Sequence, residues 1–273
     1  MPLSVSVIIP VFNGALTIER AIRSVLDQSR SALEIIVIDD HSGDTSIDIV
    51  QQLAAKSPVP IRLVTNDSNL GPGLARNEGW DLAIGDLVAF LDADDFWHPA
   101  KLAAQATEME AHPDLVMTCH ERTVGNHSGW TSEAATATQW RYFSFQDFLI
   151  RNRCATPSVV LRRTITERFS SELRLAEDYY LWLLITARYG PTRFNPCALV
   201  HCTNPAYGGS GLSGNLRAMY SSELRALQLL HQQRHLGRLK LVVFGVWSTV
   251  KFLVRLVDHF VLRGRIQTVS ESR

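Results

Sequence analysis

Cysteine is scarce in this chain of 273 residues, and the familiar motifs of nucleotide-binding loops are missing. The four cysteines, at positions 119, 154, 197 and 202, lack the paired spacing of a zinc site, so we expect reduced thiols, as in a cytosolic protein. No G-x-G-x-x-G run follows the first apolar segment, and no Walker sequence occurs. These absences argue against NAD chemistry and P-loop ATP hydrolysis. A basic, apolar leader is also missing before residue 4, which argues against a signal peptide.

Net charge is absent as well, because 27 Lys and Arg residues balance 27 Asp and Glu residues. The two signs are nevertheless separated along the chain. Residues 1–120 hold 17 acidic and 7 basic residues, whereas residues 121–273 hold 10 acidic and 20 basic ones. An acidic segment suits a metal or another cationic ligand, and a basic segment suits phosphate, nucleic acid or an anionic membrane surface.

Short apolar runs alternate with helical patterns over the first 120 residues. Such alternation predicts an α/β protein with a mostly parallel sheet that helices cover on both faces. The expected strands are 4–10, 34–39, 61–66, 87–91 and 115–119, and the expected helices are 15–28, 45–56 and the segment from the 71–73 turn to about 84. Beyond them we expect helices near 145–151, 177–189, 216–235 and 239–262, strands at 158–162 and 198–202, and loops at 121–139 and 208–214.

Acidic residues cluster where the fourth expected strand ends. Asp92, Asp94 and Asp95 place three carboxylates within four residues, and charges of the same sign repel at that spacing. A divalent cation such as Mg²⁺ or Mn²⁺ would offset the repulsion, with one or two carboxylates and substrate phosphates as its usual ligands. Because ligands bind at the carboxyl ends of parallel strands, we predict a metal site there rather than a solvated acidic loop.

Four segments between Ser4 and Leu102 together resemble a known family. They are SVIIPVFNG, IIVIDDHSGDT, NLGPGLARNEG and VAFLDADDFWHPAKL, and their order and spacing are similar to those of the nucleotide-sugar domain of family 2 glycosyltransferases. TPSVVLRR, AEDYYLWLL and GGSGLSG match more loosely and resemble enzymes that build bacterial surface polysaccharides. The resemblance implies an α/β GT-A fold with a catalytic domain over 1–215, split into nucleotide-sugar (1–120) and acceptor (121–215) halves, and a helical extension over 216–273.

The resemblance also implies a UDP-sugar site, position by position. Pro10, Phe12 and Asn13 match the turn that holds the uracil ring and the ribose. Asp40 matches the carboxylate that accepts a hydrogen bond from the uracil N–H, while Asp39 is expected to secure the end of its strand.

Phosphate and metal ligands are implied in the same way. Arg76 matches a basic residue near the base and the phosphates. Asp94 and Asp95 match the D-x-D element, in which the first acid contacts ribose and the second ligates the Mn²⁺ or Mg²⁺ that bridges the two phosphates. Asp94 is therefore the second candidate metal ligand. Asp92 is the outer acid of this segment, and we expect it to contribute less to the site.

Glu177 and Asp178 open a predicted helix and form a second group of candidate residues. In the family an acid from such a pair is the general base, which implies that Asp178 is the base and Glu177 its support. Acidic residues also favour the first turn of a helix for electrostatic reasons, so helix capping is the alternative. Leu181, Leu184 and Ile185 have the spacing to anchor this helix and hold its N-terminus rigid.

The implied reaction is an inverting, metal-dependent transfer of one sugar from a UDP-sugar to a saccharide acceptor that is implied to be lipid-linked. The Q-x-x-R-W motif of processive members is missing, since the nearest string, QQRH at 232–235, lacks the tryptophan. No nucleic-acid partner is expected. The alternatives are a sugar-phosphate nucleotidyltransferase, for which the first turn lacks the glycines and basic residues, and a scaffold that binds a nucleotide-sugar without turnover.

Residues 239–262 look superficially like a membrane span but lack a long uncharged run. The longest such run, 241–250, has ten residues, whereas a span needs about twenty. On a helical wheel the polar residues form a stripe about 100° wide opposite a broad apolar face. This pattern predicts a helix in the interface of an anionic membrane, at its cytoplasmic side, with packing on the catalytic domain or a second copy of the chain as alternatives. The stripe residues are Lys240, Ser248, Lys251, Arg255, Asp258 and His259.

Overall fold

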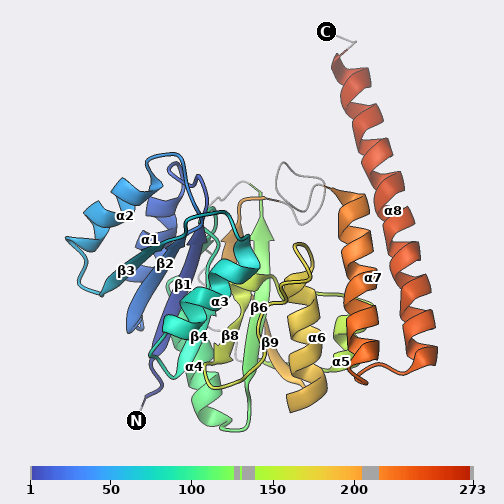
Figure 1. The fold of residues 1–273 in the computed structure, drawn as a ribbon, viewed down its shortest axis with the longest axis horizontal. Coiled ribbons are helices and arrows are strands. Elements are labelled where there is room, and N and C mark those ends of the chain that lie inside the picture. The colour runs from blue at the N-terminus through green and yellow to red at the C-terminus, as the bar shows by residue number, and fades with distance from the viewer. Residues whose placement is uncertain (1, 126–129, 131–138, 205–214, 271–273) are drawn as a thin grey trace.

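The computed structural model describes residues 2–125, 130, 139–204 and 215–270, in which one sheet is flanked by helices (Figure 1). The strands are β1 (Val5–Val11), β2 (Glu34–Asp39), β3 (Ile61–Thr65), β4 (Leu87–Phe90), β5 (Phe96–Trp97), β6 (Met117–Val124), β7 (Arg141–Phe143), β8 (Val160–Arg162) and β9 (Thr192–Cys202). The helices are α1 (Ile18–Leu26), α2 (Ser46–Ala54), α3 (Pro72–Leu82), α4 (Lys101–Ala111), α5 (Phe145–Ile150), α6 (Glu177–Tyr189), α7 (Leu216–Gln232) and α8 (Arg238–Ser270).

The described strands lie in the order β3-β2-β1-β4-β8-β6-β9-β5, and β7 also pairs with β9. β3, β2, β1 and β4 are parallel, as the alternation of strands and helices predicts. β8 runs antiparallel between β4 and β6, whereas β6 and β9 are parallel. The chain winds outward through β2 and β3 and returns to the other side of β1 at β4. Such a reversal of strand order opens a crevice at the carboxyl ends of the strands.

Alternate residues of the parallel strands face two different layers of helices. Ile8 and Phe90 point into a core shared with α3, α5, α6 and α7, while Ile9 and Ala89 point into a core shared with α1, α2 and α4. Burial on both faces explains why these strands are continuous apolar runs. Gly79 lets α3 approach β1 closely, because a Cβ at this position would lie 2.5 Å from Ile8 Cγ2.

The second half of the chain completes the same sheet and contains more strand than the sequence predicts. β9 begins at Thr192, well before the expected strand at 198–202, and β6 extends to Val124 into the expected 121–139 loop. β5 and β7 were not predicted. β5 and β7 contain only two and three residues, and the early part of β9 mixes polar and apolar residues, so none of them shows an extended apolar alternation. The prediction of α6 over 177–189 is confirmed, whereas the 208–214 loop and most of 126–138 lie outside the described residues.

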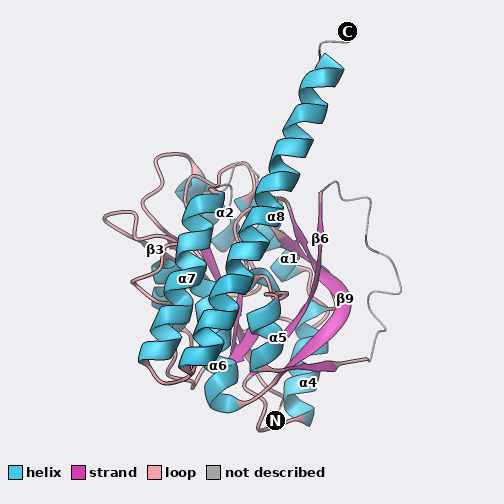
Figure 2. Cartoon of the chain, turned by 90° about the vertical axis from the view of Figure 1, so that its right-hand side faces the viewer, coloured by secondary structure: helices cyan, strands magenta, loops and turns pink. Residues whose placement is uncertain are grey.

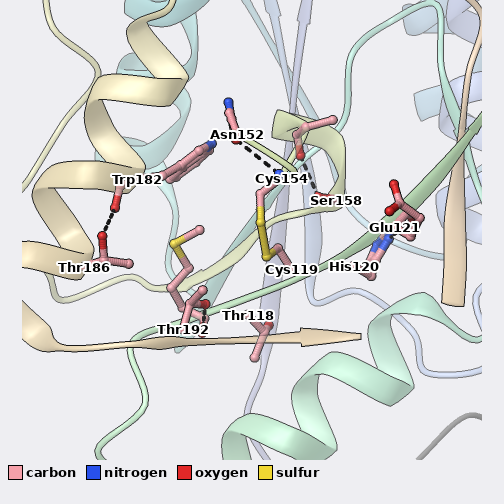
Figure 3. The surroundings of a disulfide bond; sticks show 12 residues. Thr118, Cys119, His120, Glu121, Asn152, Cys154, Ser158, Trp182, Thr186 and Thr192 are labelled. Atoms are coloured by element: carbon pink, nitrogen blue, oxygen red, sulfur yellow. Dashed lines mark hydrogen bonds between the residues drawn. A yellow bond between two sulfur atoms is a disulfide. The ribbon is translucent and has the colours of Figure 1, made fainter. Parts of the chain in front are cut away.

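A disulfide joins Cys119 of β6 to Cys154, which lies just before β8 (Figure 3). The two residues are separated by 35 positions in the sequence, but the fold brings their Cα atoms to 5.9 Å. Cys197 and Cys202 are free thiols. The expectation of four reduced cysteines is therefore wrong for the first pair, because sequence spacing does not reveal a proximity that the sheet creates.

α7 and α8 lie side by side at one end of the sheet, and the C-terminal part of α8 projects beyond the body (Figure 1, Figure 2). Tyr220 stacks on Phe252 with ring centroids 4.6 Å apart, and the hydroxyls of Tyr220 and Thr249 are 2.8 Å apart. Leu241 and Phe244 pack against the main core. No helix in the described part of the chain combines the length and apolar character that crossing a bilayer requires.

The middle of the polar stripe of α8 faces the protein, whereas Lys240 and Asp258 of the same stripe and much of the apolar side are exposed. Ser248 is buried, and Lys251 and Arg255 contact Glu223 of α7. The exposed apolar side is thus not covered by the catalytic domain, contrary to one alternative. Its residues are Leu239, Val242, Val243, Val246, Trp247, Val250, Leu253, Val254 and Val257.

Candidate active site

A cleft of about 1400 Å³ opens at the carboxyl ends of the parallel strands. One side, which we call the strand-end wall, consists of residues 10–14, 40, 69–76 and 92–95. The other side, the helical wall, consists of residues of α7, its cap and α8, and the N-terminus of α6 lies in the same lining. The residues of the helical wall are Asn215, Ala218, Met219, Glu223, Trp247, Val250, Lys251, Val254 and Arg255. The lining includes every site residue that the sequence predicts, namely Pro10, Phe12, Asn13, Asp40, Arg76, Asp94, Asp95, Glu177 and Asp178.

The turn after β1 is tied to the turn after β2. Asn13 has a left-handed backbone (φ 51°), its amide donates to Ser42 Oγ at 2.9 Å, and its Oδ1 accepts from the Gly43 amide at 2.8 Å. Pro10 is buried in β1, whereas the Phe12 side chain is 53% exposed. The turn therefore holds an apolar ring at the entrance of the cleft, where it is free to contact a ligand.

Asp39 and Asp40 organise the end of β2. Asp39 Oδ2 accepts from the Ser42 amide at 3.0 Å, as expected of a residue that secures the strand end. Asp40 Oδ1 accepts from Leu70 N at 2.9 Å and Oδ2 accepts from Gly71 N at 2.8 Å, with a further bond from the Asn66 side chain. A carboxylate has about four acceptor positions, so Asp40 keeps the capacity for another donor.

The acidic segment after β4 is held by residues that follow β9. Asn204 Nδ2 donates to Asp94 Oδ2 at 2.8 Å, and the Thr203 amide donates to Asp95 Oδ1 at 2.9 Å. Arg20 of α1 donates to the Asp94 carbonyl at 2.6 Å. Burial, together with the charges of the neighbouring acids, raises the pKa of Asp94 and raises that of Asp95 to about 8. The site thus carries more negative charge than its own donors stabilise.

Arg76 links the two groups of acids. Its guanidinium is buried, with Nη2 at 2.6 Å from Asp92 Oδ1 and Nη1 at 3.2 Å from Glu177 Oε1. Asp92, which was predicted to be an outer acid of less importance, is therefore the partner of the arginine predicted in the site. The sequence did not reveal this bridge, because Arg76 and Glu177 are 101 residues apart.

Glu177 and Asp178 occupy the first turn of α6, and neither is its N-cap. The N-cap is Ala176, in a left-handed conformation (φ 56°) and without a side-chain capping bond. Asp178 Oδ1 accepts from Tyr179 N at 2.6 Å. Burial and the charge of Asp178 raise the pKa of Glu177 to about 7, and burial raises the pKa of Asp178. Glu177 is therefore poised to exchange a proton near neutral pH, and Asp178 holds its proton more tightly than an ordinary aspartate.

The platform beneath these acids is rigid, as predicted. Leu181, Leu184 and Ile185 are buried in the main core. The N-terminus of α3 packs against Glu177, since a Cβ at Gly73 would lie 3.0 Å from Glu177 Cγ. α6 thus holds its acids against the strand-end wall.

The helical wall contains cations that the sequence-based site did not include. Lys251 Nζ lies 3.1 Å from Glu223 Oε2, and Arg255 Nη1 lies 2.8 Å from Glu223 Oε1. Trp247 Nε1 donates to the Ile150 carbonyl at 2.9 Å. The four-residue spacing of Lys251 and Arg255 marks one helix face, but only the fold shows that this face lines the cleft.

Other polar residues near the cleft have structural partners. His201 is buried, its Nδ1 is 3.0 Å from Thr123 Oγ1, and its ring lies 4.8 Å from that of Phe96.

In the described part of the chain, no group of three or more His, Cys, Asp or Glu side chains is arranged to hold a metal by itself.

Comparisons with known proteins agree with this arrangement. The family model described as Glycosyl transferase family 2 matches residues 6–168, which is more than half of the chain. The Escherichia coli UDP-Glc:alpha-D-GlcNAc-diphosphoundecaprenol beta-1,3-glucosyltransferase WfgD is 32% identical over 211 residues, covering 77% of this chain and 80% of that protein. An uncharacterized glycosyltransferase of Nostoc sp. is 39% identical over 134 residues, covering 49% of this chain and 41% of its own length.

Among solved structures, S. aureus TarS 1-349 in complex with UDP-GlcNAc superposes with a TM-score of 0.70 at 20% sequence identity. The superposition covers 93% of this chain and 72% of that one. This likeness confirms the predicted α/β GT-A fold.

Proposed function

Because this chain belongs to glycosyl transferase family 2 and is a glycosyltransferase, we propose that it moves one sugar from a UDP-sugar to a lipid-linked saccharide during bacterial surface polysaccharide synthesis. The observation that carries the proposal is the single cleft in which Arg76 joins Asp92 to Glu177. The acids that would hold a metal beside the nucleotide diphosphate therefore line the same cleft as the acids of α6 that would remove a proton. In this proposal residues 1–215 form the catalytic domain.

The strand-end wall receives the UDP part of the donor. Phe12 offers an exposed ring to the flat uracil, and Asp40 has an acceptor position left for the uracil N–H. Asp94 lies where a ribose hydroxyl would follow. A UDP-sugar is supported by the UDP-Glc named for WfgD and by the UDP-GlcNAc bound to TarS.

The residues of the acidic segment fit a divalent cation shared with the donor. Asp94 and Asp95 accept hydrogen bonds from Asn204 and Thr203. Burial, together with the charges of the neighbouring acids, raises the pKa of Asp95 to about 8, so a bound cation would stabilise its ionised form. Mg²⁺ and Mn²⁺ often take one or two carboxylates together with substrate phosphates. Asp95, with Asp94 beside it, would hold the ion, which when bound would stabilise charge on the departing diphosphate.

Asp178 serves as the general base. It accepts the proton of the acceptor hydroxyl as that oxygen forms a bond to the anomeric carbon, while the bond from this carbon to the diphosphate oxygen breaks and UDP departs. Attack from the face opposite UDP inverts the anomeric centre. Glu177, held by Arg76, supports Asp178 from the neighbouring position.

The proposed acceptor class rests on a relative, and the proposed location rests on α8. WfgD acts on a sugar linked to diphosphoundecaprenol, a lipid. The exposed apolar side of α8 supports contact with the cytoplasmic face of an anionic membrane, where such acceptors lie, and basic residues outnumber acidic ones by 10 to 3 in residues 217–273. A dimer through the same face is the competing outcome of the membrane test described below.

UDP release tests the proposal. Purified full-length protein is incubated with each of several UDP-sugars, with a GlcNAc-diphospho-lipid acceptor, and with or without Mn²⁺. We expect UDP release that requires both the acceptor and the metal, with a product of inverted configuration by NMR. Release that is independent of acceptor, or transfer with retention, would contradict the proposed reaction.

A further inference from the structure

Glu223, Lys251 and Arg255 form a cluster that lines the cleft and carries one more positive than negative charge. The Glu223 side chain is 8% exposed, and those of Lys251 and Arg255 are 17% and 20% exposed. Two partly buried cations on one carboxylate hold their positions while retaining a net charge for an anion. None of the roles proposed above uses this cluster.

The cluster lies close to the proposed base. Lys251 Nζ is 5.9 Å from the centroid of the Tyr179 ring, and Tyr179 directly follows Asp178. Glu223 and Arg255 lie farther along the same helical wall. An acceptor whose hydroxyl reaches Asp178 would therefore bring groups on the other side of its sugar ring toward these cations.

Part of the exposed apolar side of α8 adjoins this cluster. Trp247, Val250 and Val254 line the cleft and are also 41%, 43% and 55% exposed. Leu253 and Val257 continue the apolar surface outside it. A net positive cluster next to an exposed apolar strip fits a ligand that joins an anionic head to a long apolar chain.

We propose that Lys251 and Arg255 bind the diphosphate of the acceptor, and that the adjoining apolar residues of α8 receive the first part of its lipid chain. This inference rests on the acceptor class in the proposed function. It assigns the donor diphosphate to the strand-end wall and the acceptor diphosphate to the helical wall.

Binding measured without turnover tests the subsite. Farnesyl diphosphate is the probe, titrated by calorimetry into the full chain, with inorganic pyrophosphate (head alone), farnesol (chain alone) and phosphatidylglycerol vesicles for comparison. The Lys251→Gln/Arg255→Gln double variant should bind farnesyl diphosphate about tenfold more weakly or worse, since two charge-assisted contacts are lost. Its UDP affinity should stay within about twofold. The matched control is Arg238→Gln/Lys240→Gln, at the start of α8 and outside the cleft lining.

The Glu223→Gln variant should change the affinity for farnesyl diphosphate in the opposite direction. Removing this carboxylate leaves both cations in place with more net charge, so farnesyl diphosphate should bind about threefold tighter or more. If the cluster only stabilises the packing of α7 on α8, the same variant should weaken binding or leave it unchanged. This second variant decides the question even if the double variant fails to fold.

The outcomes separate this subsite from the proposed function. Binding of the probe by the double variant within about twofold of wild type, or weaker binding by Glu223→Gln, would overturn the subsite. Equal binding of phosphatidylglycerol vesicles and farnesyl diphosphate, with the same dependence on Lys251 and Arg255, would also overturn it in favour of a general membrane contact. Loss of sugar transfer with the Lys251- and Arg255-dependent binding intact would overturn the proposed function alone.

Discussion

The strand-end wall holds Asp40 and Asp95 in part through backbone amides, whereas the helical wall holds Lys251 and Arg255 through ion pairs with a side chain. Asp40 and Asp95 accept from the amides of Leu70, Gly71 and Thr203. On the helical wall, Lys251 and Arg255 both form ion pairs with Glu223. Backbone donors are fixed by the sheet, so the first wall is suited to a constant ligand such as a nucleotide, while the second can vary by substitution.

The two walls also differ in charge, and Arg76 is the place where the acids of the strand-end wall meet those of α6. The strand-end wall is acidic at 92–95 and the helical wall is net positive at 223, 251 and 255. A shared cleft with opposite charges on its two sides favours two different ligands. The predictions below test whether the walls are functionally separate.

The largest effect on turnover is expected when the proposed general base, Asp178, is replaced. Asp178→Asn keeps the shape of the side chain but cannot accept the proton, so turnover should fall by about 10²–10⁴. UDP affinity should not change, because the base does not belong to the strand-end wall. Steady-state kinetics and calorimetry measure both, with Glu172→Gln, an exposed acid before α6, as the control. A loss smaller than about tenfold would place the base elsewhere, with Glu177→Gln tested next.

Arg76→Met should be the most destabilising single change in the site. It leaves Asp92 and the buried Glu177 without their shared cation, at a cost of about 3 kcal/mol. Urea unfolding measures this difference, and Arg62→Met on the exposed side of β3 serves as the control. A cost like that of the control would mean that Arg76 does not hold the two groups of acids together.

Asp95→Asn should remove the metal dependence of nucleotide binding. The amide can still accept from Thr203, so the fold is kept, but the charge that attracts a cation is lost. The gain in UDP affinity on adding Mn²⁺ should shrink by about tenfold or more. Calorimetry with and without Mn²⁺ gives the answer, with the exposed Asp67→Asn as control. An unchanged gain would remove Asp95 from the metal site.

The pH profile should report the acids of α6. The base must be ionised, and burial raises the pKa of Glu177 to about 7 and raises that of Asp178 above its ordinary value. The acidic limb of kcat/KM should therefore lie at a higher pH than the ordinary aspartate range, and kcat/KM should fall about tenfold per pH unit below it. Because the charge of Arg76 lowers both pKa values, Arg76→Met should move this limb to higher pH. A profile that is flat down to pH 5 would contradict the assignment.

The smallest effect on stability is expected on α8. Val246→Glu/Leu253→Glu alters exposed side chains only, so the free energy of unfolding should change by about 0.5 kcal/mol or less. Co-sedimentation with anionic liposomes should nevertheless be lost. Ile84→Glu, which replaces an apolar residue that is 69% exposed outside the helical wall, should leave it intact. Unchanged co-sedimentation would contradict membrane contact through this face, and a shift from dimer to monomer in light scattering would support the dimer alternative.

The sequence predicted the strand-end wall well because its residues belong to continuous motifs. Each short apolar strand is followed directly by its polar residues, so Asn13, Asp40 and Asp95 could be placed at one edge of the sheet from periodicity and resemblance. The helical wall could not be placed in this way. Helical spacing shows that Lys251 and Arg255 share a face, but the direction of that face depends on how α8 packs on α7.

Contacts between segments that are far apart in the sequence could not be predicted from it either. The bridge from Arg76 to Glu177, the support of Asp95 by Thr203 and the Cys119–Cys154 disulfide all join residues that the sheet brings together. Strands such as β5 and β7 contain only two and three residues, which is too short to show an apolar alternation in the sequence.

Hydrogen–deuterium exchange of the full chain with UDP and Mn²⁺ tests the separation of the two walls most directly. If the strand-end wall binds the nucleotide, exchange should slow at residues 10–14, 40–43, 66–76 and 92–95. Exchange at residues 216–258 of the helical wall should stay the same. Slowing confined to α7 and α8, with no change at the strand ends, would contradict the account.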